Sequence, residues 1–242
     1  MFNKIENIEI NKNDIGITTE IEEKLLKYSN NIINIALFGV DSEEGKVGRS
    51  DSIIIETIDA KHKKLKLTSI MRDSYVNIDG VGKDKINHAY DFGGPQLAIK
   101  TLNENFDLNI SKFLSVNFTT LPKIIDMLGG LTLDITNEEV KYIPGIGVEG
   151  RYKLNGSQAL AYSRIRYASG GDYVRTDRQR AVLSKVLEKI INMNKSEYAS
   201  IVGEILPMLK TNLKYSEIIN LVIEVFKIGL SELYQERFLR DG

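Results

Sequence analysis

The stretch IINIALF, at positions 32–38, decides the fold class of this sequence. It is short, almost wholly apolar and bounded by Asn31 and Gly39, which is typical of a buried central strand. Two further strand patterns follow at residues 52–58 and 64–69, and the turn at 59–61 between them predicts a β-hairpin. The first third of the chain is therefore predicted to build the middle of a β-sheet.

Helical patterns alternate with strands in the remainder of the sequence. Residues 97–106 have helical spacing and predict a helix entered at Pro95 as a first-turn proline. A long helix is predicted from Thr176 as its cap, with Gln179 in the capping-box position. The alternation predicts an α/β protein: one α/β/α domain with a central mixed β-sheet flanked by helices. Residues 1–30 are predicted as a linker with a short helix, and 31–242 as the domain.

Composition excludes several classes of site. The 242 residues contain no cysteine and two histidines, which rules out disulfides, cysteine nucleophiles and iron–sulfur or zinc-finger sites. The net charge of −1 argues against a dedicated DNA-coating protein. No apolar run approaches the roughly 18 residues that span a bilayer, so the sequence as it stands predicts a soluble chain.

Two carboxylates flank the connection between the first and second predicted strands. Asp41 follows the strand at 32–38 and Asp51 precedes the strand at 52–58, so both are expected at one edge of the sheet. Two converging carboxylates suit Mg²⁺, which prefers one or two of them together with substrate phosphate. The alternative, which the residues alone favour, is that both are ordinary turn residues.

An arginine cluster is the strongest signal in the sequence. Five of the ten arginines fall within residues 164–180, although lysine is the more abundant cation. Arginine in place of lysine indicates bidentate contacts to phosphate or carboxylate. Arg175 and Gln179 are four residues apart and share a helix face, and Asp172 is expected in a glycine-rich bend before them. The alternative is a solvated basic loop.

The sheet edge is expected to collect further charge. Arg72 ends the third predicted strand, and Arg49 lies beside Asp51. A group of five or six cations with two or three carboxylates exceeds what a single phosphate needs and suits a pyrophosphate with its metal. This inventory is typical of phosphoryl transfer, in which a protein positions groups and neutralises charge.

Seven segments, in order, resemble the LytR-CpsA-Psr family. They are FGVD, GRSDS, IMRD, KINHAY, DMLGGL, LNGSQAL and the arginine cluster, at 38–41, 48–52, 70–73, 85–90, 126–131, 154–160 and 164–179. The resemblance implies a phosphotransferase on the outer face of the cytoplasmic membrane of a Gram-positive-type bacterium. It implies transfer of a glycopolymer of teichoic acid or capsule type from a polyprenyl-pyrophosphate carrier to peptidoglycan, assisted by Mg²⁺. It also implies a hydrophobic groove for the lipid and an N-terminal membrane anchor, which this sequence does not contain.

The resemblance also implies roles for individual residues. The metal ligands would be Asp41 and Asp51, and the catalytic residues Asp41, Arg72, Arg166 and Asp172. Pyrophosphate would be bound by Arg49, Arg72, Arg164, Arg166, Arg175 and Gln179. Either Asp41 or Asp172 would take the proton from the attacking hydroxyl. Met71 replaces the proline usual in the family, and the loop between Asp41 and Asp51 is short.

Other interpretations remain open at the level of sequence. His88 is predicted to be a hydrogen-bonding structural residue, with substrate contact as the alternative. A pyrophosphatase would use the same site with water as the nucleophile. A nucleic-acid-binding transcriptional attenuator would use the arginines on a phosphate backbone, but the sequence has no helix-turn-helix pattern, and no nucleic-acid partner is expected.

Overall fold

A computed structural model describes residues 5–28, 32–42, 47–166, 171–229 and 233–238 of the chain. These residues form two compact units: a sheet unit, residues 5–117 and 209–238, and a helical unit, residues 118–208. Across the described ranges, no helix combines the length and the apolar character that crossing a membrane requires.

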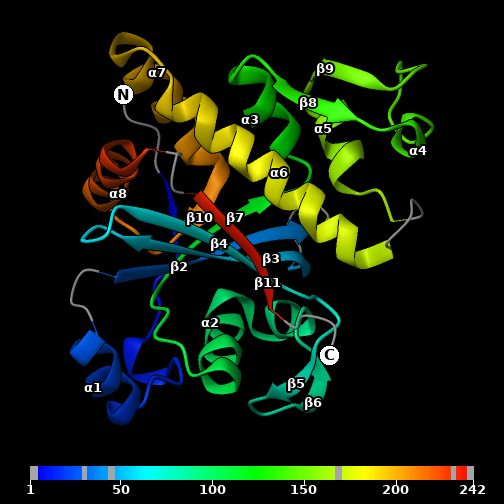
Figure 1. Ribbon diagram of the computed structural model, residues 1–242. Coiled ribbons are helices and arrows are strands. Elements are labelled where there is room, and N and C mark those ends of the chain that lie inside the picture. The colour runs from blue at the N-terminus through cyan, green and yellow to red at the C-terminus, as the bar shows by residue number, and fades with distance from the viewer. Residues whose placement is uncertain (1–4, 29–31, 43–46, 167–170, 230–232, 239–242) are drawn as a thin grey trace. The chain divides into compact units, whose positions relative to one another are not determined.

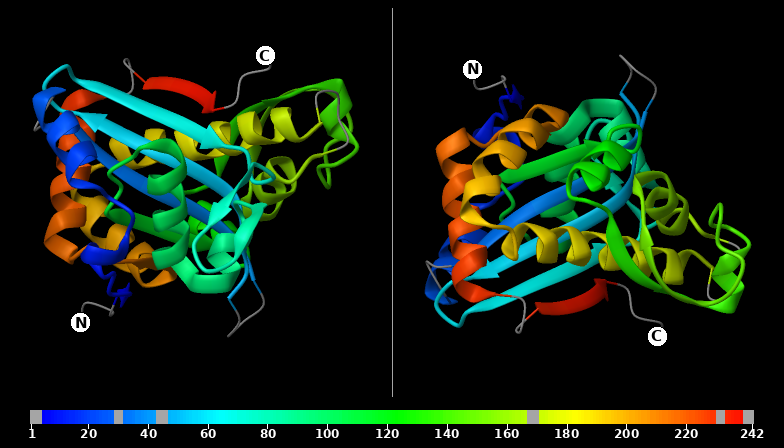
Figure 2. Two further views of the ribbon diagram at one scale, coloured as in Figure 1. Left: turned by 90° about the horizontal axis from the view of Figure 1, so that it is seen from below. Right: turned by 90° about the horizontal axis from the view of Figure 1, so that it is seen from above.

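The main sheet of the sheet unit is mixed, as the sequence predicts (Figure 1). Its central strands β2, β3 and β4 are antiparallel neighbours, whereas β7 pairs with β2 in parallel and β11 runs parallel to β4 along one edge (Figure 2). In spatial order the strands are β1 (Glu6–Asn7), β10 (Leu209–Thr211), β7 (Lys112–Asn117), β2 (Ile32–Asp41), β3 (Arg49–Asp59), β4 (Lys64–Ile70) and β11 (Leu233–Phe238). The three strands predicted first are thus confirmed at the centre of the sheet.

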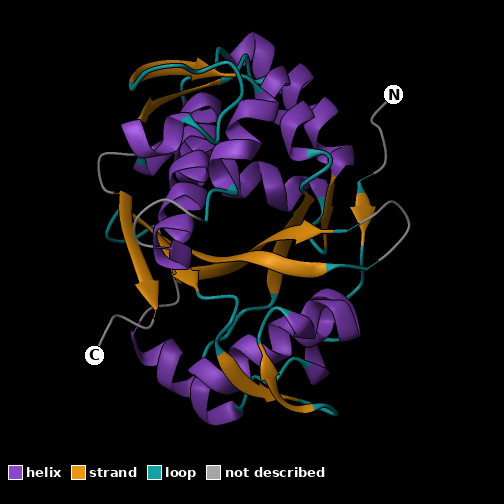
Figure 3. Cartoon of the chain, turned by 90° about the vertical axis from the view of Figure 1, so that its right-hand side faces the viewer, coloured by secondary structure: helices purple, strands orange, loops and turns teal. Residues whose placement is uncertain are grey.

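Helices cover the sheet within this unit. Helix α2 (His88–Phe106) lies on one face, and α8 (Tyr215–Ile228) lies on the other, with α1 (Thr19–Tyr28) on the α2 side (Figure 1). Figure 3 shows the small hairpin of β5 (Tyr75–Ile78) and β6 (Gly82–Lys85) beside α2. Helix α2 contains the non-helical residues Gly93 and Gly94, so the segment from Pro95 begins as predicted, after an unpredicted turn that starts at His88.

The core of the sheet unit lies between α2 and the sheet. Phe38 and Phe113 are almost completely buried there, and Phe38 meets Tyr90 edge-on with 5.2 Å between ring centroids. The hydroxyl of Tyr90 donates to Ser115 Oγ at 3.0 Å, so the one polar atom of this aromatic cluster is satisfied. Alternate residues of β2 and β3 supply this face because strand side chains alternate.

The opposite face of the sheet carries a buried acid. Glu56 lies in the middle of β3 between Ile35 and Leu67 on the neighbouring strands, and its Oε1 has no hydrogen-bond partner among the described residues. Burial raises the pKa of Glu56 from 4.5 to about 7, because an apolar setting disfavours the charged carboxylate.

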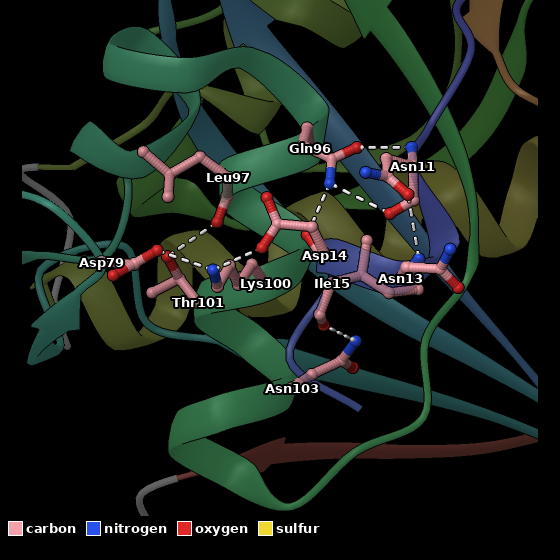
Figure 4. Close-up of polar contacts among 10 residues, drawn as sticks. All are labelled: Asn11, Asn13, Asp14, Ile15, Asp79, Gln96, Leu97, Lys100, Thr101 and Asn103. Atoms are coloured by element: carbon pink, nitrogen blue, oxygen red, sulfur yellow. Dashed lines mark hydrogen bonds and ion pairs between the residues drawn. The ribbon is translucent and has the colours of Figure 1, made fainter. Parts of the chain in front are cut away.

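The N-terminal segment is held on α2 by polar contacts (Figure 4). Lys100 pairs with Asp14 at 2.5 Å and with Asp79 at 2.6 Å, and Asn103 donates to the carbonyl of Ile15 at 2.7 Å. Gln96 donates to the carbonyl of Asp14. These bonds hold the buried side chain of Ile15 in the core, with the 3-10 turn η1 (Lys12–Asp14) just before it.

The helical unit has its own core. It contains α3 (Leu121–Met127), β8 (Leu131–Ile135), α4 (Asn137–Val140), β9 (Gly150–Leu154), α5 (Gly156–Ser163), α6 (Gly171–Ile191), α7 (Lys195–Ile205) and η2 (Leu206–Met208). Strands β8 and β9 form a separate hairpin, and apolar residues such as Leu131, Leu154 and Val182 pack between it and the helices. Gly156 starts α5 against the backbone of Pro122, where a side chain has no room.

Candidate functional site: an acid–arginine edge and an arginine helix

A β-bulge sets the position of Asp51 in the sheet unit. Gly39 of β2 pairs with Ser52 of β3, but the next residue, Val40, pairs with Ser50. Asp51 is therefore the extra residue of the bulge and has no partner on β2. Bulges bend a strand and redirect a side chain, and they are common beside functional sites.

The redirected carboxylate of Asp51 meets Arg72. Arg72 Nη1 lies 2.7 Å from Asp51 Oδ2, and both side chains are only about 13–15% exposed. Arg72 lies two residues after the end of β4, so the ends of two neighbouring strands present the pair at one end of the sheet. The structure thus brings together two residues that the sequence predicted at this edge.

Asn87 completes this group, and the sequence analysis gave it no role. Its side-chain amide donates to Asp51 Oδ1 at 3.3 Å, its N–H donates to the carbonyl of Arg72, and its carbonyl accepts from the N–H of Ser50. Asn87 is buried, and its Oδ1 has no hydrogen-bond partner among the described residues. A buried amide oxygen without a hydrogen-bond partner is uncommon in folded proteins, so it draws attention to this end of the sheet. Asn87 lies in the KINHAY segment, one of the seven segments that resemble the family, and this was the sequence feature that could have identified it as a site residue.

Arg72 is also oriented by a second acid. Its Nε lies 3.5 Å from Asp73 Oδ2, and Lys85 Nζ lies 2.8 Å from Asp73 Oδ1. The guanidinium group is therefore placed between two carboxylates, which fixes the plane in which it presents its N–H groups. Neither Asp73 nor Lys85 was singled out from the sequence.

Asp41 and Arg49 end the hairpin beside this group. They are directly opposite one another at the last paired position of β2 and β3, and both are exposed. Residues 43–46, the middle of the loop between them, lie outside the described residues. The two side chains are thus at the predicted edge, on neighbouring strands.

A histidine–aspartate pair lies at the start of α2. His88 Nδ1 is 2.8 Å from Asp84 Oδ2, and the ring of Phe92 stands edge-on to the imidazole at 5.9 Å between centroids. The hydrogen bond from His88 lowers the pKa of Asp84, and the positive charge of Arg49 contributes in the same direction. The prediction that His88 makes a hydrogen bond is confirmed.

The arginine cluster belongs to the helical unit. Arg164 follows α5, and its guanidinium carbon lies 5.0 Å from the ring centroid of Phe118, a cation–π distance. Arg166 is exposed two residues later. Residues 167–170, which belong to the same segment, lie outside the described residues.

Helix α6 begins earlier than the sequence predicts. It starts at Gly171, so Thr176 is inside the helix, where its hydroxyl donates to the carbonyl of Tyr173 in place of capping an end. Asp172 therefore lies in the first helical turn and not in a bend. The Thr176 prediction failed because a hydroxyl that bonds back to a carbonyl suits a helix interior as well as a cap.

Arg175 and Gln179 are both buried and lie one turn apart on α6. Their shared face confirms the spacing argument, but Arg175 is only 2% exposed, far less than a surface arginine.

Two arginines of the cluster are used inside the fold. Arg178 Nε donates to Glu139 Oε1 at 2.7 Å, both side chains are buried, and Arg178 also donates to the carbonyl of Ile165. Glu139 accepts in addition from the N–H of Thr136 in the capping box of α4. Arg180 pairs with Asp177. Arg178 and Arg180 thus pair with carboxylates of the protein itself. These two of the five clustered arginines are therefore explained without a role in binding substrate.

The predicted site residues therefore form two groups, each described within its own unit. Asp41, Arg49, Asp51 and Arg72 belong to the sheet unit, whereas Arg164, Arg166, Asp172, Arg175 and Gln179 belong to the helical unit. The meeting of the two groups on one ligand stays a prediction.

Comparison with known proteins decides the family. The family model described as the LytR_cpsA_psr family matches residues 3–238, nearly the whole chain. The chain belongs to the LytR-CpsA-Psr family. The resemblance drawn from seven short segments is thereby confirmed.

Curated relatives of this LytR-CpsA-Psr protein carry transferase names. It is 34% identical over 242 aligned residues to the polyisoprenyl-teichoic acid–peptidoglycan teichoic acid transferase TagU of Enterococcus faecalis strain V583, covering 93% of this chain and 79% of that protein. It is 39% identical over 190 residues to the TagU of Oceanobacillus iheyensis, covering 75% of this chain and 58% of that protein. The second alignment thus spans little more than half of the relative's length.

A solved structure of the family is similar over most of its length. TagT bound to LIIa-WTA is 29% identical to this chain, with a TM-score of 0.74, covering 86% of this chain and 79% of that chain. The match confirms the predicted fold class, a mixed α/β fold with a central sheet flanked by helices.

Proposed function

We propose that this protein is a phosphotransferase that moves a teichoic-acid-type glycopolymer from a polyprenyl-pyrophosphate carrier to peptidoglycan. Two relatives are named as transferases of this kind, and the TagT structure is named as bound to LIIa-WTA. The observation that carries the proposal in this chain is the pairing of Asp51 with Arg72 at a β-bulge, beside the buried, unsatisfied amide oxygen of Asn87. A capsule-type polymer is the alternative cargo.

The arginines supply the electrostatic part of the reaction. As the family resemblance implies, the pyrophosphate would be bound by Arg49, Arg72, Arg164, Arg166, Arg175 and Gln179. Guanidinium groups that are already oriented stabilise the charge that develops on the leaving polyprenyl phosphate. Arg72 is oriented by Asp51 and Asp73, which favours this role.

The chemistry of the donors at the sheet edge fits Mg²⁺. Oxygen ligands are what this cation prefers, and the edge offers the carboxylates of Asp41 and Asp51. Mg²⁺ commonly keeps several waters and binds through one or two carboxylates together with substrate phosphate. When bound, Mg²⁺ would neutralise charge on the pyrophosphate oxygens.

We place the activity at the outer face of the cytoplasmic membrane, where a lipid carrier and peptidoglycan meet. The proton acceptor for the attacking hydroxyl was left open between Asp41 and Asp172 by the sequence. Asp41 is also a proposed metal ligand, and a carboxylate engaged by a cation is a poor proton acceptor.

A product assay tests the proposal. The protein is incubated with a synthetic polyprenyl-pyrophosphate-linked glycan, with and without peptidoglycan fragments, and with Mg²⁺ or EDTA. We expect polyprenyl phosphate to appear together with glycan phosphate joined to the acceptor, only when acceptor and Mg²⁺ are present. Equal release of lipid phosphate without acceptor would identify a pyrophosphatase instead.

A matched pair of arginine variants locates the chemistry. Arg166→Ala removes an exposed arginine of the cluster, and Arg151→Ala removes an exposed arginine of β9 in the same unit. We expect transfer to fall about 10²- to 10³-fold in the first variant and to stay at the wild-type rate in the second. Normal transfer by Arg166→Ala, or steep salt-dependent binding of DNA without any turnover, would remove the transferase assignment.

A further inference from the structure

The pair formed by His88 and Asp84 has the arrangement of a proton acceptor and its orienting acid. Its 2.8 Å contact joins Nδ1 of the imidazole to Oδ2 of the acid, and the side chains are 19% and 32% exposed. Asp84 is itself fixed, because its Oδ1 accepts from the N–H of Lys85 at 2.7 Å. A carboxylate on one ring nitrogen sets the tautomer that leaves the other nitrogen able to accept a proton.

The state of Asp84 supports this tautomer. The hydrogen bond from His88 lowers the pKa of Asp84 below its ordinary value, so the acid is an anion at neutral pH. An anionic oxygen accepts only, which places the imidazole proton on Nδ1. Within the described part of the chain, Nε2 makes no hydrogen bond, and it is therefore the nitrogen that a substrate hydroxyl can reach.

The pair also lies beside the residues proposed to bind the pyrophosphate. His88 directly follows Asn87, which contacts Asp51 and is bonded to the backbone of Arg72 and of Ser50. The charge of Arg49 acts on Asp84. Backbone continuity and electrostatics thus both connect the imidazole to the same end of the sheet, within one unit.

The surroundings of the imidazole are few and identifiable. Asp84 comes from β6, and Arg49 comes from β3. On α2 itself, Asp91 is exposed and the Phe92 ring packs edge-on against the imidazole. On β5, the remaining element packed at this end of α2, the titratable side chain is Tyr75, which is 70% exposed. Two lysines, Lys83 and Lys85, also lie on β6, and the Nζ of Lys85 pairs with Asp73 Oδ1 at 2.8 Å.

We propose that His88 is the general base of the transfer reaction, oriented by Asp84. An acceptor hydroxyl of peptidoglycan attacks the phosphorus that carries the glycan, and its proton passes to His88 Nε2. The new oxygen–phosphorus bond forms as the bond to polyprenyl phosphate breaks, and the leaving phosphate takes the electron pair. The imidazolium then returns its proton to solvent. This role rests on the proposed transferase function.

The chain contains a matched control for this proposal. His62 makes the same kind of contact, with 2.7 Å between Nδ1 and Asp59 Oδ2, in the turn between β3 and β4. This turn is the opposite end of the sheet from Arg49 and Arg72, because β3 runs from Arg49 to Asp59. His62→Gln therefore removes a histidine–aspartate pair of equal geometry that lies away from the proposed site.

The experiment compares wild type, His88→Gln, Asp84→Asn and His62→Gln in the transfer assay between pH 5 and pH 9. We expect kcat of His88→Gln to fall about 10²- to 10⁴-fold, with little change in KM for the lipid donor, and the acid limb of the pH profile to disappear. Asp84→Asn is expected to lose less activity and to shift that limb. His62→Gln is expected to match wild type in rate and profile.

Two further measurements separate the possible failures. Binding of octaprenyl pyrophosphate and the thermal midpoint are followed for each variant, since a purely structural histidine would change these and leave the shape of the pH profile intact. Wild-type activity with an unchanged pH profile in His88→Gln overturns the base assignment and leaves the transferase standing. Absence of transfer by the wild-type protein overturns both. If His88→Gln strongly lowers the thermal midpoint of unfolding, the pH–rate profile of Asp84→Asn, the milder change, decides whether His88 is the base. An acid limb that does not shift in Asp84→Asn then overturns the assignment.

Discussion

Arg72 Nη1 lies 2.7 Å from Asp51 Oδ2, and Asp51 is the residue that the β-bulge of β3 leaves without a partner on β2. The bulge places the carboxylate of Asp51 where Arg72 can pair with it. The extra residue turns its side chain out of the regular ladder, and the arginine at the end of β4 meets it there. Asn87 then holds the second carboxylate oxygen, so the acid is fixed from two sides.

Replacing this acid tests the site at the sheet edge. Asp51→Asn keeps an oxygen for Arg72 but removes the charge that Mg²⁺ and the guanidinium share. We expect transfer activity to fall at least about 10²-fold and the Mg²⁺ concentration for half-maximal rate to rise. Asp134→Asn, at an acid that is 78% exposed on β8, is the control and is expected to behave as wild type. An unchanged Mg²⁺ requirement in Asp51→Asn would contradict the metal assignment.

The buried pair of Arg178 and Glu139 is predicted to support folding. Arg178→Met leaves a buried carboxylate without its partner, which costs about 3–5 kcal/mol of unfolding free energy. Chemical denaturation measures the difference. Lys185→Met, on the same helix, removes a partly exposed pair with Glu188 and is expected to cost about 1 kcal/mol or less. Equal destabilisation by the two variants would argue against the burial of the Arg178 pair.

Stability is predicted to depend on pH through Glu56. Its pKa is about 7 in the folded state and 4.5 as the ordinary value, so between these pH values the unfolded chain loses a proton that the folded chain keeps. The free energy of unfolding therefore falls as pH rises through this window, by about 3 kcal/mol at most. Glu56→Gln is expected to be more stable than wild type at pH 8 and similar at pH 4.5. Denaturant titrations at the two pH values measure this, and a pH-independent difference would contradict it.

The N-terminal segment is predicted to depend on Lys100. Hydrogen bonds to Asp14 and Asp79 raise the pKa of Lys100, so the amine stays charged throughout the ordinary pH range. Lys100→Met removes both contacts. We expect faster amide hydrogen exchange in residues 11–17, with little change in the midpoint of global unfolding. Lys227→Met, which removes only an exposed pair with Glu224, is the control. An unchanged rate of amide exchange in Lys100→Met would contradict this, because the hydrogen bonds of Gln96 and Asn103 would then be enough to hold the N-terminal segment on α2.

Local patterns predicted most of the secondary structure. The apolar run at 32–38, the hairpin that follows and the helix from Pro95 all appear, because periodicity and turn chemistry act over a few residues. Helix α6 starts at Gly171, ahead of the predicted cap Thr176, because a hydroxyl at Thr176 satisfies a carbonyl inside the helix as readily as it caps an end.

By itself, the sequence determined the fold class, the family and the identities of Asp41, Asp51 and Arg72 as residues of one sheet edge. Tertiary structure alone decided which partners these residues have. Asp51 meets Arg72 because of a bulge, a register feature between strands, and Arg178 meets Glu139 across 39 residues of chain. Contacts of this kind depend on strand register and on packing between elements, which no short stretch of sequence encodes.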